Sequence, residues 1–91
     1  VGMIVGEKLW RLSRQHQVLC ITHLPQLAGF GDQHFKVTKG IVEGRTHTEA
    51  LLLEGEARQQ ELAQMLGPVS EGTLQSADDI LEVVHQRKQS Q

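Results

Sequence analysis

Hydrophobic residues in the first fifteen positions recur at helical spacing. Val5, Leu9 and Leu12 lie three or four residues apart, and Met3 and Trp10 form a second pair seven residues apart. Four charged residues supply a polar face: Glu7, Lys8, Arg11 and Arg14. The pattern predicts an amphipathic helix over residues 2–15, in which Trp10 is a packing anchor rather than a ligand platform.

The hydrophobic pattern changes at Val18–Ile21, where four apolar residues follow one another without a polar break. Such a run is too short for an independent helix, and it is typical of a strand that is buried on both faces in a parallel sheet. Periodicity alone does not exclude a buried helical segment. The polar turn at residues 13–16 and Pro25 on the other side favour a strand over residues 17–21, with Cys20 pointing into the core or to the opposite face of the strand.

Thr22 and His23 follow this predicted strand. Ligands of open α/β sheets bind at the carboxyl ends of strands, so both side chains are candidates for a binding site. Pro25 disfavours helical geometry at Leu24 and is itself well suited to open a short helix that continues to Ala28. Thr22–Leu24 is therefore expected to be extended or turned.

His23 is the strongest functional candidate, because an imidazole there would donate to a phosphate oxygen or order a water molecule. The alternative is a structural histidine at a strand end. The Thr22 hydroxyl would orient His23 or line a nucleotide site, although a plain strand-end threonine fits equally well. Gln26 is a further candidate contact, for which a solvated helix start is the preferred interpretation.

The middle of the chain alternates between apolar and polar residues, which indicates strands. Residues 34–39 and 46–53 are expected to pair as an antiparallel hairpin around a turn at Glu43–Gly44. Phe35 and Val37 are expected to face inward, with polar side chains outward at an exposed edge.

Two further helices are predicted towards the end of the chain. Residues 56–66 place Leu62, Met65 and Leu66 on one face before Gly67, which is a typical helix stop. The last helix is expected from Thr73 to Lys88, with an apolar stripe on one side. Together the elements predict an α/β fold with a buried parallel strand, flanking helices and an antiparallel hairpin.

Composition and charge limit the classes of function that the chain can have. The chain has 91 residues, enough for one small domain or part of one, and nine basic against eleven acidic residues give a net charge of −2. This balance provides no basic footprint for direct contact with nucleic acid. A single cysteine cannot form an internal disulfide and is compatible with a reducing cytoplasm.

Other chemistries find little support in the sequence. A Cys-x-x-His pair exists at Cys20 and His23, but no second pair follows at zinc-finger spacing, so no metal site is expected. No serine lies in a nucleophile-elbow pattern. The phosphate-binding Walker A pattern G-x-x-x-x-G-K-[ST] does not occur in the chain.

Two segments carry a resemblance to a known family. Residues 21–28, Ile-Thr-His-Leu-Pro-Gln-Leu-Ala, resemble the switch-histidine segment (H-loop) of the bacterial RecN family, which belongs to the SMC-like branch of the ABC-type ATPases. Residues 61–67, Glu-Leu-Ala-Gln-Met-Leu-Gly, resemble a helix near the C-terminus of the same family. The order and spacing of the elements between them also fit.

The resemblance implies that residues 1–91 form the C-terminal portion of an ATPase head domain, with Walker A, the signature motif and Walker B supplied by sequence upstream. It implies that His23 is catalytic and contacts the γ-phosphate of ATP, that Thr22 contributes to ATP binding, and that Mg²⁺ accompanies the nucleotide. The implied partners are the N-terminal ATPase lobe of the same protein and a second head in a head-to-head homodimer. The implied role is cytoplasmic, in recombinational repair of DNA double-strand breaks, with DNA contacts outside this segment.

Two other functions are compatible with the residues. The first is a non-catalytic α/β interaction module that docks a partner through the hairpin and the last helix. The second is the C-terminal part of another P-loop ATPase, such as an SMC or transporter head, although the Leu-Pro-Gln extension after His23 argues against it. Acidic Walker B residues directly upstream of Val1 would favour the RecN-like interpretation.

Overall fold

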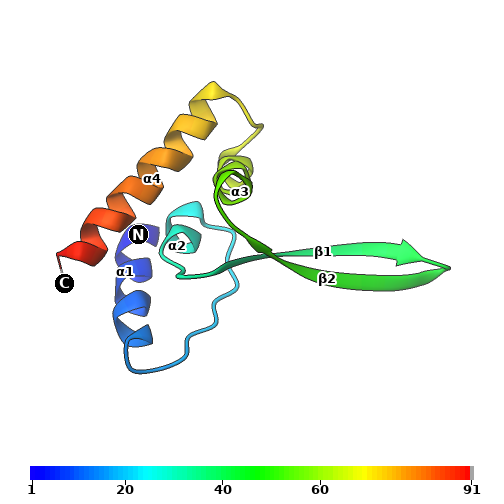
Figure 1. The fold of residues 1–91 in the computed structure, drawn as a ribbon, viewed down its shortest axis with the longest axis horizontal. Coiled ribbons are helices and arrows are strands. Elements are labelled where there is room, and N and C mark those ends of the chain that lie inside the picture. Colours follow the sequence, from blue (N-terminus) through cyan, green and yellow to red (C-terminus); the bar gives the residue numbers. More distant parts are fainter. Residues whose placement is uncertain (91) are drawn as a thin grey trace.

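The computed structural model describes residues 1–90 as an α/β arrangement of helices with one two-stranded sheet. Figure 1 shows the helices gathered at one side and the hairpin projecting from them. Within residues 1–90, none of the helices combines the length and the apolar character needed to cross a membrane. In chain order the elements are α1 (Gly2–Ser13), α2 (Pro25–Gly29), β1 (His34–Val42), β2 (Arg45–Leu53), α3 (Glu56–Leu66) and α4 (Glu71–Gln89).

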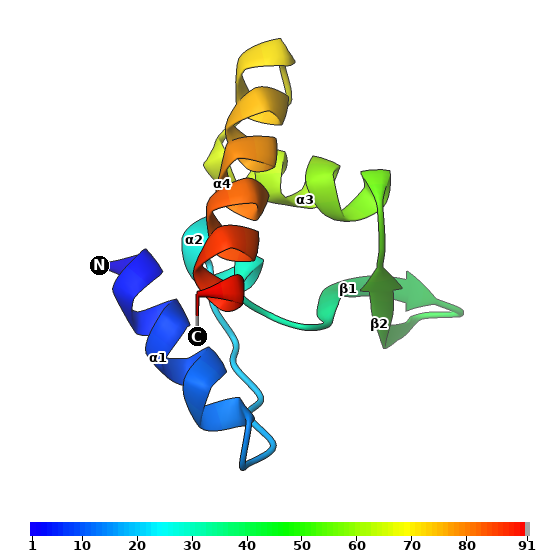
Figure 2. The same cartoon turned by 60° about the vertical axis from the view of Figure 1, so that its left-hand side comes forward.

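The helices are held together by two small hydrophobic clusters. The first joins α1 and α4 around the residue that follows α2, and it contains Trp10, Phe30 and Val84 with Met3 and Ile80 at its edge. The second lies between α3 and α4, with Ala28 of α2 against it; its buried members are Leu62, Ala63 and Ala77. Helix α2 therefore lies where all the other helices meet, as the turned view in Figure 2 also shows.

Two glycines allow this close approach around α2. A Cβ atom on Gly6 of α1 would lie 2.6 Å from Cδ2 of Phe30, and one on Gly29 would lie 2.9 Å from Cγ2 of Ile80. Both distances are too short for carbon atoms in van der Waals contact. Larger residues at these positions would push α1 or α4 away from α2.

The predicted hairpin is confirmed, with longer strands than the sequence indicated. The strands β1 and β2 pair in an antiparallel register that places His34 opposite Leu53 and Val42 opposite Arg45. Glu43 and Gly44 both have positive φ, at 51° and 76°. This backbone is the one that a two-residue hairpin turn requires, because it follows the right-handed twist of the strands.

The predicted orientation of the hairpin was wrong. Phe35 and Val37 are 49% and 62% exposed, whereas Lys36 on the opposite face is half-buried. The Lys36 ammonium lies 2.9 Å from the Glu61 carboxylate, so this face meets α3 through an ion pair. The apolar face that carries Phe35 is left uncovered by the rest of residues 1–90.

The buried parallel strand at residues 17–21 was also wrong. These residues form neither helix nor strand, and Cys20 is exposed. Leu19 and Ile21 are 88% and 96% exposed. A strand needs a neighbour for its backbone groups, and the sheet of the described residues contains only β1 and β2, which pair with each other. The α/β arrangement with an antiparallel hairpin is confirmed, whereas the P-loop architecture expected from the resemblance is not confirmed by residues 1–90.

The remaining helices follow the sequence closely. The helix α3 spans the predicted residues 56–66 and ends at Gly67, whose φ of 155° favours glycine. The helix α4 begins two residues earlier than predicted, because Ser70 and Thr73 form a capping box. The Ser70 hydroxyl accepts from the Thr73 N–H at 3.2 Å, and the Thr73 hydroxyl accepts from the Ser70 N–H at 2.8 Å.

Candidate functional site

His23 lies on a bend between residues 17–22, which form neither helix nor strand, and Leu24, the residue that precedes α2. The backbone N–H of Leu24 donates to the Thr22 hydroxyl at 3.0 Å, so the threonine side chain closes a turn around His23. Leu24 is extended, with φ −94° and ψ 117°, as a residue before proline should be. Thr22 and His23 thus form one local unit, in which the hydroxyl holds the backbone of the turn.

The His23 side chain is exposed. It makes no hydrogen bond or ion pair with any other residue of the described 1–90. Both ring nitrogens are consequently open to an outside group, as a donor or as an acceptor. Gln26 is half-buried rather than solvated, and it lies beside Gly2 of α1.

The segment after His23 is firmly held, beginning with Pro25. This proline is buried at the first position of α2, where its missing N–H leaves no donor unsatisfied. The N–H of Ala28 donates to the Leu24 carbonyl at 3.0 Å and closes the turn of the helix. The predicted short helix is therefore confirmed, and it extends one residue further, to Gly29.

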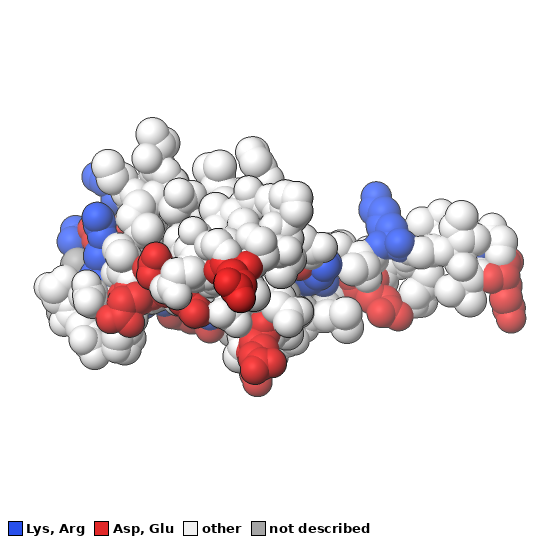
Figure 3. All heavy atoms as spheres, turned by 90° about the horizontal axis from the view of Figure 1, so that it is seen from above, with Lys and Arg blue, Asp and Glu red and all other residues white. Residues whose placement is uncertain are grey.

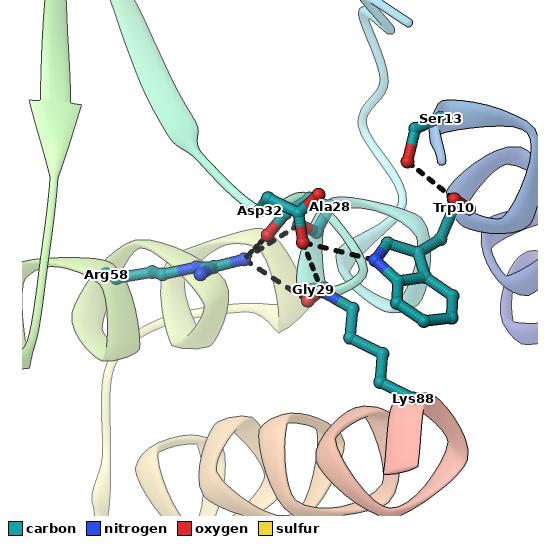
Figure 4. A network of polar contacts seen from close by, with 8 residues as sticks. Trp10, Ser13, Ala28, Gly29, Asp32, Arg58 and Lys88 are labelled. Carbon is teal, nitrogen blue, oxygen red and sulfur yellow. Dashed lines mark hydrogen bonds and ion pairs between the residues drawn. The ribbon is translucent and has the colours of Figure 1, made fainter. Parts of the chain in front are cut away.

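Arg58 of α3 caps the carboxyl end of α2. Its Nη2 donates to the carbonyl oxygens of Ala28, Gly29 and Gly31 at 3.3, 3.2 and 2.6 Å. The last carbonyls of a helix have no hydrogen-bond partner within the helix, and they form the negative end of its dipole. A guanidinium at this end donates hydrogen bonds to these carbonyls and places a positive charge beside the negative end. Figure 4 shows the Arg58 side chain reaching this end of α2 from α3.

Asp32 ties α1 and α4 to the residues just beyond α2. One oxygen of its carboxylate accepts from Nε1 of Trp10 at 3.1 Å and from Nζ of Lys88 at 3.0 Å. Partial burial by itself would raise the pKa of Asp32, but the Lys88 hydrogen bond and charge, together with the Trp10 hydrogen bond, lower it below its usual value. The Lys88 ammonium also lies 5.4 Å from the centre of the Trp10 ring, within cation–π range.

Burial and neighbouring charges shift the pKa values of Arg58 and His34. Burial lowers the pKa of Arg58, while the nearby Asp32 carboxylate raises it, and an arginine remains protonated throughout the accessible range. Burial also lowers the pKa of His34, and the Arg58 charge lowers it further, whereas Glu61 raises it. His34 Nδ1 and Arg58 Nε are buried without a hydrogen-bond partner among the described residues.

Sequence reasoning missed both Arg58 and the Asp32 network. Asp32 is 22 residues from Trp10 and 56 residues from Lys88, so no local spacing signals the contact. Arg58 reads as a surface residue of an amphipathic helix in the sequence. Only the packing of α3 against α2 shows that the Arg58 guanidinium donates to backbone carbonyls at the end of α2.

The surface around His23 is open rather than enclosed. Two hollows among residues 1–90, one between the hairpin and α3 and one along the hairpin, are lined by neither Thr22 nor His23. Over the same residues, no group of three or more His, Cys, Asp or Glu side chains is arranged to hold a metal ion. The arrangement presents one histidine on a supported turn, without a phosphate cradle next to it.

Comparison with curated proteins gives close matches over part of their length. The chain is 53% identical over 69 residues to DNA repair protein RecN of Xylella fastidiosa, a match that covers 76% of this chain and 12% of that protein. It is 44% identical over 80 residues to DNA repair protein RecN of Vibrio cholerae, covering 86% of this chain and 14% of that protein. The chain corresponds to a C-terminal segment of RecN.

The same name recurs in distant bacteria. The match to DNA repair protein RecN of Deinococcus radiodurans is 44% identical over 81 residues and covers 88% of this chain. The chain therefore spans about one seventh of the length of the RecN proteins that it matches, since it covers 14% of the Deinococcus protein as well. No family model matches the chain. The predicted resemblance to RecN is confirmed, whereas the predicted roles of Thr22 and His23 stay predictions.

Proposed function

We propose that this chain forms the C-terminal part of the ATP-hydrolysing head of a RecN-type protein that acts in DNA repair. The DNA repair role is supported by the names of the matching proteins. The catalytic role is supported above all by one observation: the His23 imidazole is exposed and unpaired on a turn that Thr22 and Pro25 hold in place. A side chain so placed is suited to act on a group supplied from elsewhere.

In this proposal His23 donates a hydrogen bond to an oxygen of the transferred γ-phosphate of ATP or orients the attacking water. Phosphoryl transfer depends mainly on positioning and on stabilising negative charge, so a single well-placed donor has a large effect on its rate. Thr22 keeps the His23 backbone in its turn and lies at the edge of the nucleotide site. The phosphate cradle and the ligands of Mg²⁺ would come from upstream residues of the same head.

The exposed apolar side chains support a second lobe as the direct partner of this segment. Leu19 and Ile21 are almost fully exposed, and Phe35 and Leu52 on one face of the hairpin are nearly half exposed. Groups of exposed apolar side chains mark surfaces on which another part of a protein packs. We therefore place the N-terminal lobe of the head against residues 17–21 and this face of the hairpin, with residues 17–21 becoming a strand of its sheet.

The charge distribution supports DNA contacts elsewhere in the protein. Acidic and basic side chains are interspersed on the face in Figure 3, and the whole chain has a net charge of −2. Neutralising several phosphates requires a concentrated basic surface. We place DNA binding, and the head-to-head dimer that brackets ATP, in the full-length protein, with recombinational repair in the cytoplasm as its setting.

A second candidate, a non-catalytic interaction module, is favoured by the same uncovered hairpin face. That function would use the face around Phe35 and Val37 to bind a separate protein and would need no histidine at position 23. The two candidates differ in one respect that an experiment reaches directly, namely whether the His23 imidazole affects turnover of ATP.

The test is His23→Ala in a full-length RecN-type protein that contains this segment. We expect ATP affinity to stay within about two-fold and kcat to fall by about 100-fold, as for the loss of a charge-stabilising donor. His16→Ala is the matched control, because His16 is exposed and lies before the extended stretch. Unchanged ATP turnover in the His23 variant would remove the catalytic assignment and favour the interaction module.

A further inference from the structure

Arg58 makes an unusual concentration of contacts for a side chain on a short helix. A single terminal nitrogen serves three backbone carbonyls, those of Ala28, Gly29 and Gly31. That nitrogen carries two hydrogens, so the bonds are shared, and the one to Gly31 at 2.6 Å is the shortest. All three acceptors lie at or just beyond the carboxyl end of α2, which makes Arg58 a cross-link between α3 and this end of the short helix.

His23 lies just before the other end of α2, two residues ahead of Pro25. The helix comprises five residues, Pro25–Gly29, so its length is about 7.5 Å. Its first residue is a buried proline, and the backbone between this proline and His23 is fixed by the Thr22–Leu24 hydrogen bond. Because little flexible chain separates the two ends, a shift of the carboxyl end is passed to His23.

Stability alone is a poor explanation for this arrangement. Arg58 is half-buried, its Nε has no partner among the described residues, and burial lowers its pKa. A buried guanidinium loses hydration, and protein contacts only partly replace it, so a charge in such a place often contributes little to folding. The apolar contacts of Phe30 and Ile80 already attach α2 to α1 and α4. The hydrogen bonds from Arg58 also fix the orientation of α2 relative to α3.

We propose that Arg58 is the positioning residue of the switch-histidine segment: its guanidinium holds the carboxyl end of α2 against α3 and thereby fixes where the His23 imidazole is presented. This inference rests on the proposed catalytic function of His23. It assigns to α3 a direct part in ATP hydrolysis, although no side chain of α3 reaches the histidine. Arg58 acts through backbone carbonyls and touches no substrate.

The experiment compares variants of a full-length RecN-type protein that contains this segment. Arg58→Met keeps the apolar stem and removes the donors, and we expect kcat to fall about ten-fold or more while ATP affinity changes by less than about two-fold, because small misplacements of a catalytic group are costly. Arg58→Lys keeps the charge without the planar fork and should recover part of the rate. Arg11→Met is the matched control, since Arg11 is exposed and, among residues 1–90, its side chain pairs only with Glu7 on its own helix.

The decisive readout is a double-mutant cycle with His23→Ala. If Arg58 acts through His23, adding Arg58→Met to the His23→Ala protein should lower kcat by less than about two-fold. Amide hydrogen exchange should also accelerate in residues 22–31 of the Arg58→Met protein, with α4 unchanged, which separates local displacement from global unfolding. Should Arg58→Met unfold the protein globally, with exchange equally fast in α4, the proposed local role is overturned.

Three other outcomes would each overturn the positioning role of Arg58. If His23→Ala lowers turnover but Arg58→Met does not, the positioning role is overturned and the proposed function stands. If Arg58→Met retains its full effect in the His23→Ala protein, Arg58 acts by another route and the inference is again overturned. If His23→Ala leaves turnover unchanged, the proposed function fails first, and the positioning role of Arg58 fails with it.

Discussion

The residues on the two sides of His23 differ sharply in how they are supported. Before it, residues 17–21 extend across the surface with Leu19 and Ile21 open to solvent. After it, residues 25–32 are held by three helices, through Trp10 of α1, Arg58 of α3 and Lys88 of α4. One histidine therefore lies between a segment without partners and a segment with many.

The difference between the two segments shows which kinds of structure a short chain forms without a neighbouring strand. A one-turn helix closes its first hydrogen bond locally, here from the Ala28 N–H to the Leu24 carbonyl. Its last carbonyls have no partner within the helix, and Arg58 of α3 supplies one. A parallel strand has no internal hydrogen bonds, and its stability depends wholly on an adjacent strand. Residues 17–21 thus have the composition of a buried strand, but residues 1–90 provide no neighbouring strand with which they pair.

The largest test of this comparison is Trp10→Ala, which removes the centre of the support after His23. Trp10 is 8% exposed and packs with Phe30 and Val84. Deleting a buried aromatic side chain costs about 3–5 kcal/mol of unfolding free energy. Urea denaturation of the chain, followed by far-ultraviolet circular dichroism, measures the loss. A cost below about 1 kcal/mol would mean that residues 25–32 are no better supported than residues 17–21.

A smaller effect is expected from Gly6→Ala, which adds a single methyl group between α1 and Phe30. The new Cβ would lie 2.6 Å from Cδ2 of a buried ring, and overpacking of this kind costs about 1–3 kcal/mol. Gly72→Ala in α4 is the matched control, because its Cβ would meet only the Ser70 hydroxyl at 3.6 Å. The control should stabilise the chain by up to about 1 kcal/mol through higher helix propensity. Equal effects at both positions would show that α1 is loosely packed on Phe30.

The sequence predicted those elements whose signals are local. Pro25 indicated the start of α2, Gly67 the end of α3, and Glu43–Gly44 the hairpin turn, because each acts through the backbone conformation of its own residues. The segment that presents His23 was predicted for the same reason. A start of α4 at Glu71 was missed because a Ser-x-x-Thr capping box is a weaker signal than the usual Glu or Gln at the fourth position.

Elements that depend on distant partners could not be predicted in this way. Periodicity identified the two faces of the hairpin but not which one meets α3, and in the structure the face with Lys36 does so, through its ion pair with Glu61. The capping of α2 by Arg58 joins residues 27 or more positions apart, for which a single sequence holds no signal. The candidate site was therefore predicted at its exposed histidine and missed in the contacts that support it.

The smallest effect, and the sharpest test of the comparison, is expected from Ile21→Ser. Ile21 is 96% exposed, so the substitution should change the unfolding free energy of the chain by no more than about 0.5 kcal/mol. In a full-length RecN-type protein the proposed N-terminal lobe would bury this side chain, and the same substitution should cost about 2 kcal/mol or more and lower the melting temperature of the head by several degrees. Ile80→Ser is the matched control, because Ile80 packs against Trp10 and Val84 within the described residues and should be costly in both proteins. An equally small effect of Ile21→Ser in both proteins would show that residues 17–21 remain uncovered, and the proposed strand beside His23 would have to be abandoned.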